Sequence, residues 1–489
     1  MNQVAEGLLT TIGLEVHVEL RTKTKLFCGC PVGFGGEPNT RVCPVCLGHP
    51  GTLPVLNERA VEFTNKIGMA LGCTIEARSV FHRKNYFYPD MPKNYQISQY
   101  DLPVGVSGRL DIEANGRAWP VGITRVHLEE DTGKSIHVGG GGRIHEAEYS
   151  LEDFNRAGTP LVEIVTEPDI TSPEMARAFA AELRAILESL EVSDVRMEEG
   201  SMRIDANISV APSGQRGAKA EIKNMNSLRS LLRALEFEQG RQKALLEKGA
   251  AVEQSTRHWD EKSGQTKPLR TKEEAFDYRY FPEPDLVPVE PSVEWLRQLH
   301  EELPELPSQR RHRFVEELGL SPYDAGVLVS SKWLGDLYQA TLEAAKVADP
   351  KQIANWVAND LIGALPGGLG AEEGPRVDPV HMAELVDLVA GGTISKTQGQ
   401  QVLATMIRNG GSPKELVEAE GMQQVSDREQ LGDAIDQVIK ANQEVATRIA
   451  GGDEKPFGFL MGQVMKATRG QGNPQVIRQM LREKLGMLG

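Results

Sequence analysis

The most constraining feature of this sequence is a strict alternation of apolar and polar residues from Ile12 to Arg21. Apolar side chains occupy every second position, and the residues between them are Gly13, Glu15, His17, Glu19 and Arg21. A period of two is typical of a β-strand that buries one face. The other face would carry a carboxylate, an imidazole and a second carboxylate in a row, which is a spacing that suits a divalent cation. A solvated strand face is the simpler alternative for this segment alone.

Length and composition favour a cytoplasmic protein with no membrane segment. A chain of 489 residues is expected to form two to four domains, each with its own core. It begins with no charged and then apolar leader, and no apolar run reaches about 18 residues. Five cysteines are too few and too clustered for a secreted disulfide framework.

The charge is unevenly distributed along the chain. From Glu454 to Gly489, six Lys and Arg residues against two Glu give +4, which leaves −19 for the rest of a chain whose net charge is −15. The overall charge argues against non-specific coating of nucleic acid. The basic C-terminal segment suits one specific RNA contact, although an ordinary charged helix face is an equal alternative.

The pattern of elements predicts an α+β fold with two kinds of region. Up to about residue 290, strand patterns mix with a few helices, including one capped by Ser172 and one that starts at Ser227. After Pro291 the strand patterns fade, and short Gly or Pro breaks separate helical segments. The predicted helices are Val293–Leu303, Trp333–Ala345, Gln352–Ile362, Pro379–Val389, Lys396–Ile407, Arg428–Arg448 and Gln475–Leu485.

Four of the five cysteines form two close pairs that predict a structural zinc site. Cys28 and Cys30 are followed after twelve residues by Cys43 and Cys46. Two thiolate pairs joined by a short loop are the usual arrangement for tetrahedral zinc. Four sulfur ligands leave no position for water, so we expect the metal to fold the loop and not to catalyse. Cys73 ends an apolar helix and is most simply a small core residue.

Further segments repeat the acidic pattern of the first strand. Residues 123–135 contain Glu129, Glu130 and Asp131, and Glu163 lies inside the apolar run 160–167. A carboxylate in such a run needs a positive partner, which favours a metal or a lysine. The polar faces of 202–210 and 219–223 carry the residues Arg203, Asp205, Asn207, Ser209, Lys219, Glu221 and Lys223. Carboxylates with a histidine or Asn suit Mg²⁺, and Lys and Arg suit phosphate oxygens, so these strands predict a site for a metal-bound nucleotide.

Several long motifs resemble the B subunit of the aspartyl/glutamyl-tRNA amidotransferases, the GatB family. They are IGLEVHVEL, RKNYFYPDMPKNYQISQYDLP, ITRVHLEEDTGKS, DFNRAGTPLVEIVTEPD, VRMEEGSMRIDANIS, KAEIKNMNS and DYRYFPEPDLVP. The C-terminal stretch FGFLMGQVMKATRGQGNPQVIRQML is similar to the tRNA-binding tail of that family. Together these segments extend over essentially the whole chain.

The resemblance implies a ligase that repairs misacylated tRNA. ATP would phosphorylate the side-chain carboxylate of Glu-tRNA(Gln) and/or Asp-tRNA(Asn), and ammonia would then displace the phosphate. By the same resemblance, the Mg²⁺ ligands match Glu15, His17, Glu130 and Glu163. The residues Glu129, Asp205, Asn207 and Lys219 would lie beside the bound ATP, and zinc would occupy the four cysteines.

The resemblance also implies partners and a domain layout. An amidase subunit would supply ammonia, because this chain shows no amidase signature of its own, and a small third subunit would join the two in a heterotrimer. Residues 1–292 would form the catalytic, cradle-like domain with the zinc loop. Residues 293–410 would form an all-α helical domain, and residues 411–489 a helical tail that binds tRNA. The Gly139–Gly142 segment is expected to be a hairpin tip.

Two rival functions remain open at this point. One is a metal-dependent hydrolase or nuclease that acts on RNA through the face of Glu15 and His17, and it predicts RNA cleavage without ATP. The other is a zinc-stabilised tRNA-binding scaffold with no catalytic role, and it predicts binding that does not respond to changes at Glu15 or Glu130.

Overall fold

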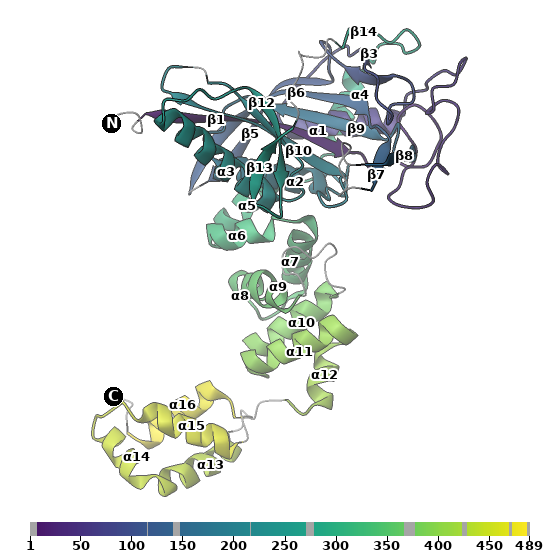
Figure 1. Cartoon of the computed structure of the whole chain (residues 1–489). Coiled ribbons are helices and arrows are strands. Elements are labelled where there is room, and N and C mark those ends of the chain that lie inside the picture. The colour runs from purple at the N-terminus through teal and green to yellow at the C-terminus, as the bar shows by residue number, and fades with distance from the viewer. Residues whose placement is uncertain are drawn as a thin grey trace. The chain divides into compact units, whose positions relative to one another are not determined.

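The computed structural model divides the chain into two compact units, Met1–Pro307 and Ser308–Gly489. The structure describes residues 7–114, 116–139, 147–215, 217–269, 278–365, 377–422, 428–468 and 472–486, without the side chains of residues 429 and 430. Residues 140–142 of the predicted hairpin tip therefore lie outside the described residues. Figure 1 shows the strands of the first unit and the helices of the second.

A nine-stranded sheet forms the body of the first unit, and the strand predicted first, β1, lies at its centre. Neighbouring strands are antiparallel except for β11 and β12. In spatial order the strands are β13 (Gln265–Pro268), β12 (Ser255–Asp260), β11 (Ala220–Lys223), β10 (Met202–Pro212), β1 (Leu8–Glu19), β9 (Pro160–Thr166), β6 (Arg117–Glu130), β5 (Gly105–Ala114) and β2 (Thr74–Ile75).

One face of this sheet packs against three helices and forms the core. The helices are α1 (Glu58–Ala70), α2 (Pro173–Ser189) and α3 (Leu228–Glu247). The alternation in β1 has the predicted effect, since Ile12, Leu14, Val16 and Val18 are almost fully buried in the core. Because the side chains of a strand alternate between its faces, the polar residues of β1 lie on the face away from these helices.

The two helices predicted from their caps are confirmed. The Ser172 hydroxyl accepts a hydrogen bond from the Met175 N–H at 3.2 Å, with Pro173 at the first turn of α2. The Ser227 hydroxyl accepts from the Ser230 N–H at 3.0 Å at the start of α3. Such side chains satisfy backbone N–H groups that have no partner within the helix.

Two smaller β elements border the polar face of the large sheet. A three-stranded sheet has the order β14 (Phe281–Pro282), β3 (Phe81–Asn85) and β4 (Tyr95–Gln99), and β4 packs against β6. Strands β7 (Lys134–Val138) and β8 (Tyr149–Asp153) pair as an antiparallel hairpin directly after β6. The helix α4 (Val293–Glu301) packs on α1, so the segment that follows Pro291 still contributes to this unit.

The second unit is helical in its described residues and holds two apolar cores, one between Phe314 and Val417 and one between Leu431 and Leu485. Its elements are α5 (Pro307–Glu316), α6 (Pro322–Leu328), α7 (Lys332–Ala344), α8 (Pro350–Asn355), the π-helix η2 (Trp356–Leu361), α9 (Ile362–Ala364), α10 (Pro379–Ala390), α11 (Lys396–Asn409), α12 (Pro413–Ala419), α13 (Arg428–Ala441), α14 (Gln443–Ala450), α15 (Phe457–Ala467) and α16 (Pro474–Lys484).

The helix predicted over Arg428–Arg448 is two helices. Asn442 separates α13 from α14 with φ −125° and ψ 45°, which is outside the helical region. Apolar periodicity continues across this break because both helices bury residues in the same core, including Ile435 and Ile449. Periodicity alone therefore does not detect the break. Among the described residues, no helix combines the length and the apolar character that a membrane crossing requires.

Candidate active site

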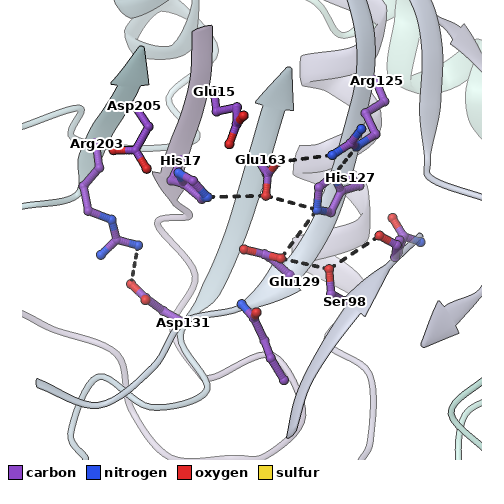
Figure 2. A network of polar contacts seen from close by, with 12 residues as sticks. Glu15, His17, Ser98, Arg125, His127, Glu129, Asp131, Glu163, Arg203 and Asp205 are labelled. Atoms are coloured by element: carbon purple, nitrogen blue, oxygen red, sulfur yellow. Dashed lines mark hydrogen bonds and ion pairs between the residues drawn. The ribbon is translucent and has the colours of Figure 1, made fainter. Parts of the chain in front are cut away.

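A row of four polar residues crosses the sheet, each from a different strand. The strand register places His127 of β6 opposite Glu163 of β9, Glu163 opposite His17 of β1, and His17 opposite Arg203 of β10. His17 Nε2 lies 3.3 Å from Glu163 Oε2, and His127 Nε2 lies 3.5 Å from the same oxygen. Figure 2 shows both imidazoles directed at this carboxylate. Adjacent strands thus bring together residues that are far apart in the sequence.

Glu163 is a buried carboxylate that positive neighbours hold ionised. Only 10% of its side chain is exposed. Burial alone would raise the pKa of Glu163, but the charges of His127 and His17 and the hydrogen bond with His17 hold that pKa well below its usual range. Arg125 adds a contact of 3.4 Å to the other carboxylate oxygen. Glu163 therefore has positive partners, as expected for a carboxylate in this apolar run, but within the described structure they are two histidines and an arginine and not a lysine.

Glu129, and not Glu130, joins this group. His127 Nε2 lies 3.5 Å from Glu129 Oε2, and the Ser98 hydroxyl donates to the same oxygen at 2.8 Å. Glu130 instead accepts from the Lys93 ammonium and, at 2.9 Å, from the Ile97 N–H, and it lines a cavity with Lys93 and two of the cysteines. Glu130 thus lies outside the group formed by His17, Glu129 and Glu163, and its match to the metal stays a prediction. Its position follows from the strand period, since neighbouring residues of β6 point to opposite faces.

The other predicted nucleotide residues lie in the rows next to His17. Glu15 is opposite Asp205, and the Asn207 amide donates to Glu15 Oε1 at 3.0 Å. The Lys223 ammonium forms an ion pair with Asp205. Lys219 lines a cavity of about 240 Å³ together with Glu15 and Asn207. The structure thus places Glu15, His17, Asp205, Asn207 and Lys219 along one strip of the sheet.

Besides Arg125, three contributors to the site were not predicted from the sequence. His127 and Ser98 contact Glu129. Burial lowers the pKa of Lys84, but this lysine lies close enough to Glu129 and Glu163 for their charges to raise that pKa overall. His127 had a signal in the sequence, because Arg125, His127 and Glu129 alternate with apolar residues within 123–130. Lys84 and Ser98 come from the smaller sheet, and no local pattern connects them with β6.

The chemistry of this group fits a hard divalent cation. Ligand atoms of His17, Glu129 and Glu163 all lie within 4.8 Å of one another. Two carboxylates and one imidazole leave room for phosphate oxygens and water, which is how proteins usually hold Mg²⁺ beside a nucleotide. Burial lowers the pKa of His17, but the hydrogen bond and charge of Glu163 raise it above its ordinary value of 6.5 overall. A proton on His17 thus competes with a metal ion for this site.

The four cysteines also meet as predicted. Ligand sulfurs of Cys28, Cys30, Cys43 and Cys46 lie within 4.8 Å of one another, and none forms a disulfide. The hydrogen bond from Cys28 lowers the pKa of Cys46 to about 4, with smaller contributions from the Cys43 N–H and the charge of Lys25. The Lys25 ammonium lies 3.6 Å from Cys46 Sγ. The cluster suits zinc because four sulfur ligands converge, and zinc would displace the protons of Cys28 and Cys30, whose pKa values are raised by the hydrogen bond with Cys46 and by burial, respectively.

Comparison with known proteins agrees with this arrangement. Residues 10–297 match the GatB/GatE catalytic domain, and residues 336–485 match the GatB domain. The chain is 51% identical to the B subunit of the aspartyl/glutamyl-tRNA(Asn/Gln) amidotransferase of Moorella thermoacetica, covering 97% of this chain and 99% of the relative. It is 50% identical to the B subunit of the same name from Carboxydothermus hydrogenoformans, covering 98% of both chains.

Binding of Mg²⁺ at this site is expected to release a proton. Because His17 has a raised pKa, it is partly protonated near neutral pH without metal, and the ion must displace that proton. Below the pKa of His17, the affinity for the metal should increase by at most about tenfold for each unit of pH. Above that pKa the affinity should no longer change with pH. Titration calorimetry with Mn²⁺ as a probe, in buffers of different ionisation enthalpy, measures the number of protons released on binding. Affinity that does not change between pH 6 and 8 would contradict the assignment of His17.

Replacing one cluster cysteine should remove zinc from the chain. Cys28→Ser is expected to lower bound zinc from one equivalent to near zero and to reduce thermal stability, because the ion holds the loop together. Cys73→Ser is the matched control, since Cys73 lies outside the cluster. Metal analysis of protein purified from zinc-supplemented cells gives the readout. A parent chain without zinc would disprove the site.

Proposed function

The chain belongs to the B-subunit family of the aspartyl/glutamyl-tRNA(Asn/Gln) amidotransferases, and from this premise we propose how its first unit performs the reaction. The enzyme is a ligase of translation that amidates the misacylated amino acid of Glu-tRNA(Gln) and/or Asp-tRNA(Asn). It works as one subunit of a larger assembly. A cytoplasmic location follows from its tRNA substrate and forms part of the proposal.

We propose that the sheet face of His17 activates the substrate carboxylate with ATP. A carboxylate is a poor electrophile, so one of its oxygens attacks the γ-phosphorus of ATP and ADP leaves. Ammonia then attacks the carbonyl carbon of the acyl phosphate, phosphate leaves with the bonding electrons, and a proton passes to solvent. The observation that carries this proposal is the convergence of His17, Glu129 and Glu163 within 4.8 Å.

Mg²⁺ would be held by His17, Glu129 and Glu163, with Glu15 in the next row of the sheet. When bound, the ion offsets negative charge on the transferring phosphoryl group. His127 orients two of the three ligands, because it contacts both Glu129 and Glu163. Lys84 adds a positive charge beside the same carboxylates, and Lys219 and Asn207 would contact the nucleotide.

No cysteine of the chain is suited to release ammonia from glutamine. Cys73 is the only cysteine outside the zinc cluster, and burial raises the pKa of its thiol to about 11. Such a thiol is almost fully protonated near neutral pH and is a weak nucleophile for glutamine hydrolysis. We therefore propose that an amidase subunit delivers ammonia and that a small third subunit completes a heterotrimer.

The neighbouring glutamates of β6 provide the sharpest test. In the reconstituted heterotrimer, Glu129→Gln should lower tRNA-dependent ATP cleavage at least a hundredfold, because it removes a metal ligand. Glu130→Gln should keep ATP cleavage within a few-fold, because Glu130 contacts Lys93 away from the ligands. The assay follows ADP release and the amino acid on Glu-tRNA(Gln) and Asp-tRNA(Asn) in a single turnover.

Other outcomes of this assay separate the alternatives. Equal loss of ATP cleavage in both variants would contradict the choice of Glu129 as ligand. Metal-dependent cleavage of the tRNA without ATP would favour a nuclease. Unchanged amidation in both variants would leave only a binding role for this face.

The C-terminal helices are proposed to bind the tRNA body. Lys455, Lys466 and Arg478 are exposed, and no ion pair engages them in the described part of the chain. The double variant Lys466→Ala with Arg478→Ala should weaken tRNA binding about tenfold and make it less sensitive to salt, because it removes contacts to phosphates. Glutamine hydrolysis by the amidase should not change. Filter binding at several salt concentrations measures the effect, and unchanged affinity would remove these helices from the tRNA interface.

A further inference from the structure

A second and larger cavity lies on the strip of the sheet that holds the metal ligands. Glu15 and Glu19 flank His17 on the same face of β1, and each lines a cavity. The cavity at Glu15 has a volume of about 240 Å³, and the cavity at Glu19 has about 450 Å³. Figure 2 shows the strip between them, from Glu15 past His17 toward Asp131.

Phosphoryl transfer requires the two reactants to approach the transferring phosphorus from opposite sides. The attacking and leaving oxygens lie roughly in line, so ATP and the substrate carboxylate cannot share one side of the phosphorus. Two cavities that flank the ligands match this demand. The cavity at Glu15 contains Lys219 and Asn207, which we assign to the nucleotide.

The charges of the larger cavity suit an aminoacyl ester better than a triphosphate. Its lining includes the four acidic residues Glu19, Asp153, Asp194 and Glu199 and the four basic residues Arg21, Arg41, Lys134 and Arg156. Burial and the nearby Asp131 raise the pKa of Glu19 to about 8, so Asp153, Asp194 and Glu199 are the lining carboxylates that would repel the concentrated negative charge of a triphosphate. An amino acid esterified to the end of a tRNA presents both an ammonium group and a phosphodiester, so it matches both signs.

Two of the basic residues are available for a phosphodiester. Arg156 already donates to the carbonyls of Thr132 and Gly133, and Arg41 donates to the carbonyl of Gly35. Arg21 and Lys134 are exposed at the cavity, and neither forms an ion pair with the residues that the structure describes.

An exposed aromatic ring completes the lining. Phe34 lies between Gly33 and Gly35 in the cysteine loop, and 73% of it is exposed. Bases of single-stranded nucleic acids stack on such rings.

We propose that this cavity receives the aminoacylated 3′-terminal adenosine of the charged tRNA, an inference that rests on the proposed function. The terminal adenine stacks on Phe34, and the last phosphodiester lies against Arg21 and Lys134. The side-chain carboxylate of the amino acid points along β1 toward His17. A volume of about 450 Å³ is in the usual range for ligands of nucleoside size.

The test uses the heterotrimer and compares two double variants of equal charge change. Arg21→Ala with Lys134→Ala removes both rim cations, and Arg109→Ala with Arg117→Ala removes two exposed cations of β5 and β6 as a control. The first variant should raise KM for Glu-tRNA(Gln) at least tenfold and leave KM for ATP within twofold. The slope of log Kd against log salt for this tRNA should become shallower by about 1.4, as expected when two contacts to a single strand are lost. The control should change none of these values.

A second variant tests the stacking contact. Phe34→Ala should weaken binding of Glu-tRNA(Gln) about tenfold, again without effect on ATP. A rise in KM for ATP with unchanged tRNA binding would show that the cavity holds the nucleotide. The proposal would also be overturned if neither the binding of Glu-tRNA(Gln) nor KM for ATP changed. Binding is measured without turnover, so a parent enzyme that binds tRNA but fails to amidate it would count against the proposed function and not against this cavity.

Discussion

The architecture of the site depends on the neutralisation of one buried carboxylate. Glu163 lies on β9 between β1 and β6, and the residues beside it on that strand are apolar. An isolated charge there would be costly, so the two imidazoles and Arg125 that face it are needed for the sheet to form as it does. A metal ion can replace the positive charge of protonated histidine, because the carboxylate oxygens that face the histidines can also bind the ion. Stability of the sheet and the capacity to hold a cation therefore have one physical origin.

Much of the first unit could be predicted from the sequence because its strands have one buried face. The alternation in residues 12–21 and 202–210 determines which side chains share a face, and the structure confirms both strands as β1 and β10. The grouping of the four cysteines as a possible metal site could be predicted from their spacing alone, since a short loop brings them together. These features are local, so they are visible without knowledge of the fold.

The remaining features depend on contacts between distant segments. Glu129 and Glu130 are neighbours of the same type, and only the register of β6 against β9 shows which one faces His17. Lys84 and Ser98 reach the site from a separate sheet. In the second unit, the short helices α5, α6 and α12 each begin at a proline and were not predicted, because seven to ten residues hold too few turns for a periodic signal. The predicted domain boundaries at 292 and 410 stay predictions, and the structure divides its two units after Pro307.

The central position of β1 affects how the chain folds during synthesis. This strand leaves the ribosome before its two neighbours, β9 and β10, which begin only at Pro160 and Met202. Until then it has an apolar face and two unpaired edges, which are features that promote aggregation. Contacts over such sequence distances also slow folding. The strand that carries His17 thus needs protection from aggregation until β9 and β10 have been synthesised.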